Sequence, residues 1–65
     1  MTTSTNNIAL LYGGTTSKEA GATFRDFYSA DAARNKFCNE LRRMGRSTPQ
    51  TELKKTDKGW IWKIK

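Results

Sequence analysis

The longest regular pattern in this sequence is SADAARNKFCNELRRMG, residues 29–45. Ser29 is a favourable N-cap, and Asp31 lies in the first turn, where the helix dipole favours an acid. Gly45 suits the left-handed conformation that commonly ends a helix. The apolar side chains recur every three or four residues, at Ala30, Ala33, Phe37, Leu41 and Met44. The pattern predicts an amphipathic helix over residues 30–44.

The C-terminal segment after Pro49 has the pattern of a β-hairpin. The runs QTELKK (50–55) and GWIWKI (59–64) flank the turn sequence TDKG (56–59), in which Gly59 suits a positive φ angle. The second run alternates between an apolar face and a mainly basic face: Trp60, Trp62 and Ile64 against Ile61, Lys63 and Lys65. This alternation predicts a sheet with one buried and one solvated face.

The N-terminal part is predicted to add two strands. The apolar run IALLY (8–12) is short and ends at Gly13-Gly14, which favours a buried strand over a helix. Residues 22–28, ATFRDFY, are rich in strand formers and would pair with that run. A helix remains an alternative there, because Ser17 could cap it with Glu19 in its first turn. Residues 1–7 lack an apolar anchor and are expected to be a disordered lead-in.

These elements predict one α+β domain over residues 8–65, in the order β-β-α-β-β, with a small antiparallel sheet packed on one amphipathic helix. The expected core consists of apolar residues from every element: Ile8 or Leu10, Leu11, Phe24, Ala33, Phe37, Leu41, Met44, Leu53, Trp60 or Trp62, and Ile64.

The composition excludes most catalytic and metal chemistry. The chain has no histidine, so serine and cysteine triads and histidine-based metal sites are absent. Cys38 is the single cysteine, expected as a small half-buried hydrophobe with no disulfide partner. A 65-residue domain has little room for a catalytic cleft. We expect a protein that is not an enzyme and that uses no cofactor and no metal.

The sequence shows no membrane or export signal. Its longest apolar runs fall far short of the roughly 20 residues of a membrane-spanning helix, and residues 1–7 do not resemble a signal peptide. We therefore expect a cytoplasmic protein with no membrane partner.

The net charge of +6 is concentrated in the second half of the sequence. Up to residue 41 the chain carries four basic and four acidic residues, whereas residues 42–65 hold eight basic residues against Glu52 and Asp57. A one-sided positive field attracts nucleic acid or an acidic protein surface. The alternative is a basic surface that only aids solubility.

Three sets of residues are candidates for binding such a partner. The solvated sheet face would carry Lys54, Lys63, Lys65 and Ile61, together with Arg25 and Tyr12, a mixture suited to phosphate contact and base stacking. The helix end carries Arg42, Arg43 and Arg46, which suit phosphates and carboxylates. Trp60 would be an anchor if it is exposed. The alternatives are lysines that deter edge aggregation, arginines that complement the helix dipole, and tryptophans that belong to the core.

The layout resembles small bacteriophage-encoded proteins, including compact inhibitors of host RNA polymerase and the shorter anti-CRISPR proteins. The likeness covers residues 8–64 and includes FYSADAA (27–33), which leads into the helix, and the hairpin at Gly59-Trp60. It implies an inhibitor or modulator that binds a host nucleic-acid-handling complex in the host cytoplasm. It has no diagnostic motif, so it assigns no functional residue. A direct DNA- or RNA-binding module and a homodimer formed through an exposed strand edge remain alternatives.

Overall fold

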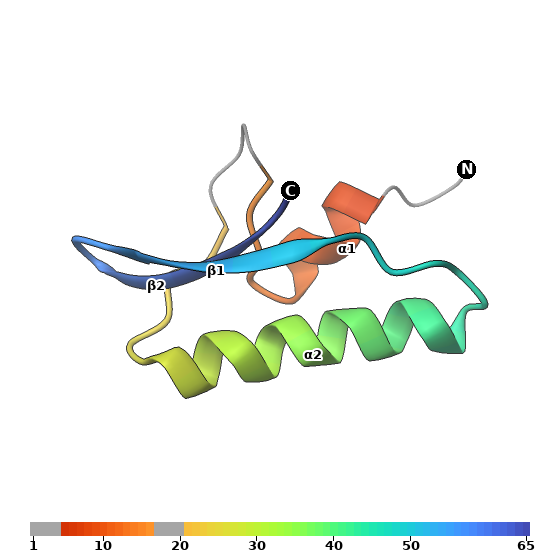
Figure 1. The fold of residues 1–65 in the computed structure, drawn as a ribbon, viewed down its shortest axis with the longest axis horizontal. Coiled ribbons are helices and arrows are strands. Elements are labelled where there is room, and N and C mark those ends of the chain that lie inside the picture. The colour runs from red at the N-terminus through yellow and green to blue at the C-terminus, as the bar shows by residue number, and fades with distance from the viewer. Residues whose placement is uncertain (1–4, 17–20) are drawn as a thin grey trace.

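The computed structural model describes residues 5–16 and 21–65, with side chains from residue 8 onward, and shows a small α+β fold. The elements are helix α1 (Thr5–Leu11), helix α2 (Phe27–Arg43), strand β1 (Thr51–Thr56) and strand β2 (Gly59–Ile64). Helix α2 runs along one face of the β1–β2 hairpin, and α1 lies beside the hairpin toward the C-terminal half of α2 (Figure 1). The order is therefore α-α-β-β, and the predicted order β-β-α-β-β is wrong.

Helix α2 confirms the central prediction but begins one turn earlier. Asp26, rather than Ser29, is the N-cap: its Oδ1 accepts a hydrogen bond from the Ser29 backbone N–H at 2.7 Å. At the other end, Gly45 has φ +74° and the Arg46 amide donates to the Leu41 carbonyl at 2.9 Å, a Schellman-type end. The helix therefore includes Phe27, which was expected in a strand.

The hairpin also matches its prediction. The strands β1 and β2 are antiparallel, with Leu53 opposite Trp62 and Thr56 opposite Gly59, whose φ is +140°. Trp62 is fully buried against α2, where its ring centroid lies 4.9 Å from that of Phe37. Strand alternation places Trp60 and Ile64 on this same inner face.

The run at residues 8–12 is helical, so its prediction as a strand is wrong. Ile8 and Ala9 are buried and Tyr12 is half-buried, whereas Leu11 is 79% exposed. Burial at positions i, i+1 and i+4 is helical spacing, and a strand would have buried alternate residues. Gly13, with φ +78°, ends this helix.

Residues 22–28 do not form the predicted strand. Within them only Phe24 makes a bridge, antiparallel to Trp60, because α1 offers no strand edge and β2 does. Thr15 forms a parallel bridge to Lys63 on the same side of β2. The expected lead-in overlaps α1, which begins at Thr5. Residues 1–4, and the alternative helix start at residues 17–19, lie outside the described residues.

The core forms where α1, α2 and β2 meet. Its buried members are Ile8, Ala9, Phe37, Leu41 and Trp62, and the half-buried residues packed against it are Tyr12, Phe24, Ala33, Cys38, Leu53 and Ile64. Leu11 and Met44, which is 45% exposed, were wrongly expected there. The buried Trp62 Nε1–H has no hydrogen-bond partner among the described residues, which is an energetic cost inside the core.

Candidate binding surfaces

The outer face of the hairpin, turned away from α2, brings part of the predicted site together. This outer hairpin face consists of Glu52, Lys54, Ile61 and Lys63, with Lys54 directly opposite Ile61 and Glu52 opposite Lys63. Lys63 Nζ lies 3.1 Å from Glu52 Oε1, whereas Lys54 is exposed and has no ion-pair partner among the described residues. The face is therefore basic but partly neutralised.

The other residues proposed for this face take different places. Lys65 continues the hairpin ladder, because its amide donates to the Gln50 carbonyl at 2.9 Å, and its side chain is exposed. Tyr12 is half-buried against the core and so is not on the outer face. Arg25 lies in the turn that precedes α2.

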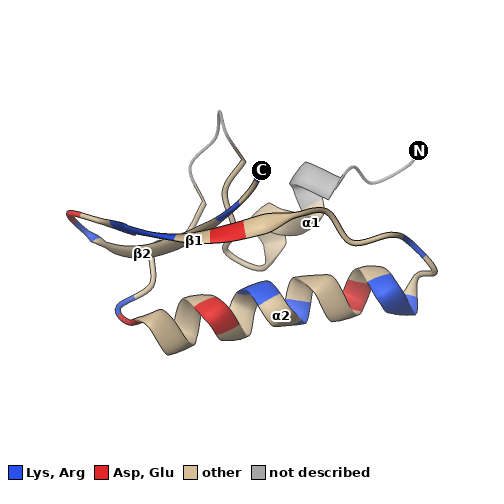
Figure 2. Ribbon diagram, viewed as in Figure 1, with Lys and Arg blue, Asp and Glu red and all other residues tan. Residues whose placement is uncertain are grey.

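The arginines of the helix end form a separate basic region. Arg42 and Arg43 occupy the last turn of α2 and Arg46 follows it; all three are exposed. Arg43 Nη1 lies 3.7 Å from Glu40 Oε2, a contact of little strength at 79% exposure. The C-terminal end of α2 and the hairpin turn lie at opposite ends of the molecule (Figure 1). Basic segments occur at both ends (Figure 2), so the expectation of a single basic region is not met.

Trp60 belongs to an aromatic cluster between the hairpin and the start of α2. Its ring packs edge-on against Phe27 with centroids 5.3 Å apart, and Phe27 packs edge-on against Tyr28 at 6.0 Å. Phe27 is 42% exposed and Tyr28 is 82% exposed. We call Phe27, Tyr28 and Trp60 the aromatic end of the molecule.

Basic side chains accompany the aromatic end. Lys55 is directly opposite Trp60 in the hairpin and is exposed, and Arg25 comes two residues before Phe27. Neither has an ion-pair partner among the described residues. The sequence prediction named Trp60 as an anchor and Arg25 for a different surface, but it did not name Phe27, Tyr28 or Lys55. The available signal was the pair Asp26 and Ser29, an N-cap pattern that would have placed Phe27 and Tyr28 on a helix beside the hairpin.

Both acidic side chains of α2, Asp31 and Glu40, form ion pairs with arginines of the same helix. Arg34 Nη2 donates to Asp31 Oδ1 at 2.8 Å, and its other amine reaches the Thr51 hydroxyl at 3.5 Å, which links α2 to β1. The backbone hydrogen bond from Ser29 lowers the pKa of Asp26 below its usual value, so this cap is ionised at neutral pH. The cations of the aromatic end are therefore left without local acidic partners except Asp26.

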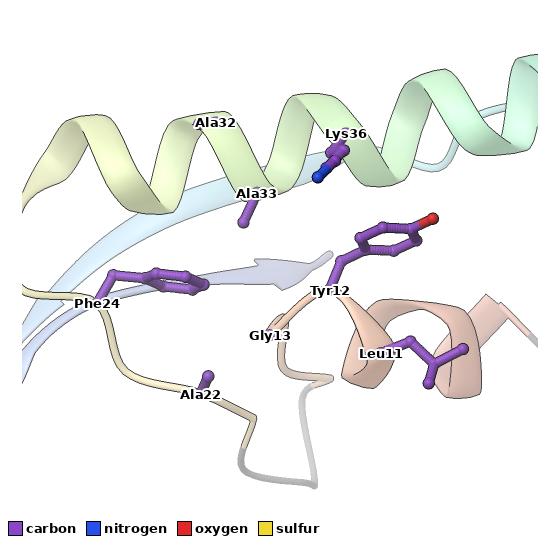
Figure 3. A pocket seen from close by; sticks show the side chains of 8 residues that line it. All are labelled: Leu11, Tyr12, Gly13, Ala22, Phe24, Ala32, Ala33 and Lys36. Atoms are coloured by element: carbon purple, nitrogen blue, oxygen red, sulfur yellow. The ribbon is translucent and has the colours of Figure 1, made fainter.

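A shallow pocket of about 390 Å³ lies between α2 and the N-terminal segment (Figure 3). It is lined by Leu11, Tyr12, Gly13, Ala22, Phe24, Ala32, Ala33 and Lys36. Its polar side-chain groups are the Tyr12 hydroxyl and the Lys36 amine, with no carboxylate among the lining residues. The pocket can accept an apolar group beside a cation, but its lining offers no acid–base pair.

The described part of the chain shows no cluster of three potential metal ligands. None of its helices combines the length and apolar character that crossing a bilayer requires. Comparison of the chain with protein-family models, curated proteins and solved structures found no match.

Proposed function

We propose that this protein is a non-enzymatic binding protein that attaches to an acidic surface of a nucleic-acid-handling protein complex and inhibits or modulates it, in the manner of small phage-encoded inhibitors. The observation that carries the proposal is the aromatic end, where Phe27 and Tyr28 are exposed beside Lys55 and Arg25.

Exposed aromatic side chains next to cations have the composition of a protein-binding hot spot. Tryptophan, tyrosine and arginine are enriched among the residues that dominate interface energies. Phe27 and Trp60 hold each other edge-on, so they present apolar area that is already ordered before a partner arrives. Burial of the exposed Tyr28 ring would add to that area.

The basic residues select the charge of the partner. Lys55, opposite Trp60, is exposed and free of ion pairs within the described residues, so it would speed encounter with an acidic surface and align it with the aromatic end. Lys54 lies on the opposite face of the hairpin and would add only long-range attraction. The arginines of the helix end lie at the far end of the molecule and would contribute only long-range attraction to a partner held at the aromatic end.

A direct DNA- or RNA-binding module is the second candidate, favoured by the same rings. Aromatic side chains beside cations can stack on bases of a single strand and neutralise its phosphates. The two candidates differ in salt dependence, because release of counterions makes nucleic-acid affinity fall steeply with added salt.

Two variants test the role of the aromatic end. Tyr28→Ala and Lys55→Glu change exposed side chains, so both should fold as the parent does. Met44→Ala and Lys65→Glu are matched controls, since they alter an exposed apolar residue and an exposed lysine outside the aromatic end. Folding of all four is checked by circular dichroism.

Capture from bacterial lysate with immobilised protein, followed by an activity assay of the captured complex, gives the readout. We expect the parent and both controls to retain and inhibit one nucleic-acid-handling complex, and both test variants to lose it. Oligonucleotide binding at about 50 mM salt that collapses at higher salt would favour the second candidate. Capture and inhibition that survive both test substitutions would contradict the assignment of the site.

A further inference from the structure

Strand β1 has one edge that carries no neighbouring strand among the described residues. Strand β2 is bonded on both sides, to β1 on one and to Thr15 and Phe24 on the other. Strand β1, by contrast, is bonded to β2 alone within residues 5–16 and 21–65. An edge of this kind presents a row of unpaired backbone N–H and C=O groups, ready to pair with another strand.

The hydrogen bonds of β2 show which residues of β1 face outward. Trp60 and Trp62 use backbone groups to bond Phe24 and Thr15, at 2.7 and 2.8 Å. Residues alternate along a strand, so Ile61 and Lys63 direct their backbone groups toward β1, where Lys54 and Glu52 are their partners. The backbone groups of the other β1 residues therefore point to the open edge: Thr51, Leu53 and Lys55.

We propose that this edge pairs with the same edge of a second copy of the chain, antiparallel and centred on Leu53. Leu53 would face Leu53 of the other copy, and Thr51 would face Lys55, in hydrogen-bonded pairs. Glu52 would then lie directly opposite Lys54 in the closer, non-hydrogen-bonded pairs, once on each side of the two-fold axis. The result is a four-stranded sheet with both α2 helices on one face.

Charge selects this register over its neighbours. A shift that centres the pairing on Glu52 sets two carboxylates opposite each other, and one that centres it on Lys54 sets two ammonium groups opposite each other. Like charges in directly opposite positions are destabilising, and opposite charges are stabilising. Of these three registers, only the Leu53-centred pairing places Lys54, which otherwise deters association, opposite an acidic residue.

The outer hairpin face supports the same register. Glu52 Oε1 already forms an ion pair with Lys63 Nζ of its own chain, at 3.1 Å. In the pair, Glu52 would lie between Lys63 on one side and the other copy's Lys54 on the other. Lys54, which has no ion-pair partner among the described residues, would gain one. The self-complementary order of Glu52, Leu53 and Lys54 thus favours a second copy over a foreign strand.

Charge exchange tests the pairing. Lys54→Glu makes positions 52 and 54 both acidic, and Glu52→Lys makes both basic, so each variant alone should dimerise at least about tenfold more weakly than the parent. An equimolar mixture of the two variants restores both opposite-charge contacts and should form a heterodimer. Lys58→Glu, in the hairpin turn, changes the net charge as Lys54→Glu does and should leave dimerisation intact.

Sedimentation equilibrium and native mass spectrometry of the purified chains measure the outcome, with circular dichroism as the check on folding. Each variant is first measured alone and then in the equimolar mixture. A heterodimer that forms in the mixture, while each variant alone stays monomeric, identifies the Leu53-centred register. A parent chain that stays monomeric at about millimolar concentration, a mixture that stays monomeric while both variants are folded, or equal loss in Lys58→Glu would overturn the proposal. If the parent is monomeric, the open edge of β1 remains available to a strand of another protein.

Discussion

Replacement of Gly14 with alanine should destabilise the protein strongly, although the change adds only one methyl group. A Cβ at this position would overlap the six-membered ring of Trp62, contacting Cζ2, Cη2 and Cε2. Gly14 has no positive φ, so the backbone itself accepts alanine and the effect is one of space alone.

Neither the backbone that would carry the added methyl group nor the Trp62 ring can move away easily. The Gly14 amide donates to the Ala9 carbonyl at 2.6 Å, and the next amide, that of Thr15, donates to the Trp62 carbonyl at 2.8 Å. Trp62 is fully buried against Phe37. Overpacking of a core usually costs about 1–3 kcal/mol, and this confinement places Gly14→Ala near 3 kcal/mol. For a domain of this size, that is a fall in Tm of roughly 12–24 °C.

A double-mutant cycle separates the clash from other effects. Trp62→Phe removes the three overlapped carbons. The losses in unfolding free energy caused by the two single substitutions should therefore sum to about 1–2 kcal/mol more than the loss measured for the double variant. Gly45→Ala is the control, because its φ is +74° but no atom lies within 4 Å of the added Cβ; it should cost about 1 kcal/mol. Urea denaturation followed by circular dichroism and tryptophan fluorescence measures the stability of all four variants. A Gly14→Ala variant as stable as the parent, or strictly additive changes, would refute the reasoning.

Two further predictions concern the helix α2. Asp26→Ala should lower Tm at neutral pH, because it removes the N-cap of this helix. The hydrogen bond from Ser29 lowers the pKa of Asp26, so the stabilisation from this cap is complete above the unfolded pKa of the carboxyl group and disappears as pH falls through the lower folded pKa. The melting temperatures of parent and variant should therefore converge as pH falls below about 4, and a constant difference would contradict the role of the carboxylate. Phe37→Ala should cost roughly 3–5 kcal/mol and leave little or no folded protein, whereas Met44→Ala, at a position 45% exposed, should cost under about 1 kcal/mol; comparable losses in urea denaturation would show that the core is misplaced.

Strong periodicity made two elements predictable from sequence. The repeat from Ala30 to Leu41 and the alternation around Trp62 are long enough to specify a helix and a hairpin. The run at residues 8–12 was too short for periodicity to separate helix from strand, and its burial depends on Trp62, far along the chain. The bridge between Phe24 and Trp60 likewise depends on a partner far along the chain, which a local sequence pattern does not reveal.

The candidate site was predictable only within single elements. Alternation correctly placed Ile61 and Lys63 together on the outer face of β2. The grouping of charges in sequence did not carry over into space, because α2 has 17 residues and is therefore about 25 Å long. Trp60 packs on the first residue of this helix and Arg43 is its last, so the helix holds the two basic regions apart.

The bridges of Thr15 and Phe24 along β2 have a consequence for self-assembly. A molecule with two bare edges can recruit neighbours without limit and grow into a fibre, whereas these two short segments occupy one side of the hairpin and leave only the other to grow. Association through strands then ends at a closed pair, and open-ended polymerisation would first require these two segments to detach from β2.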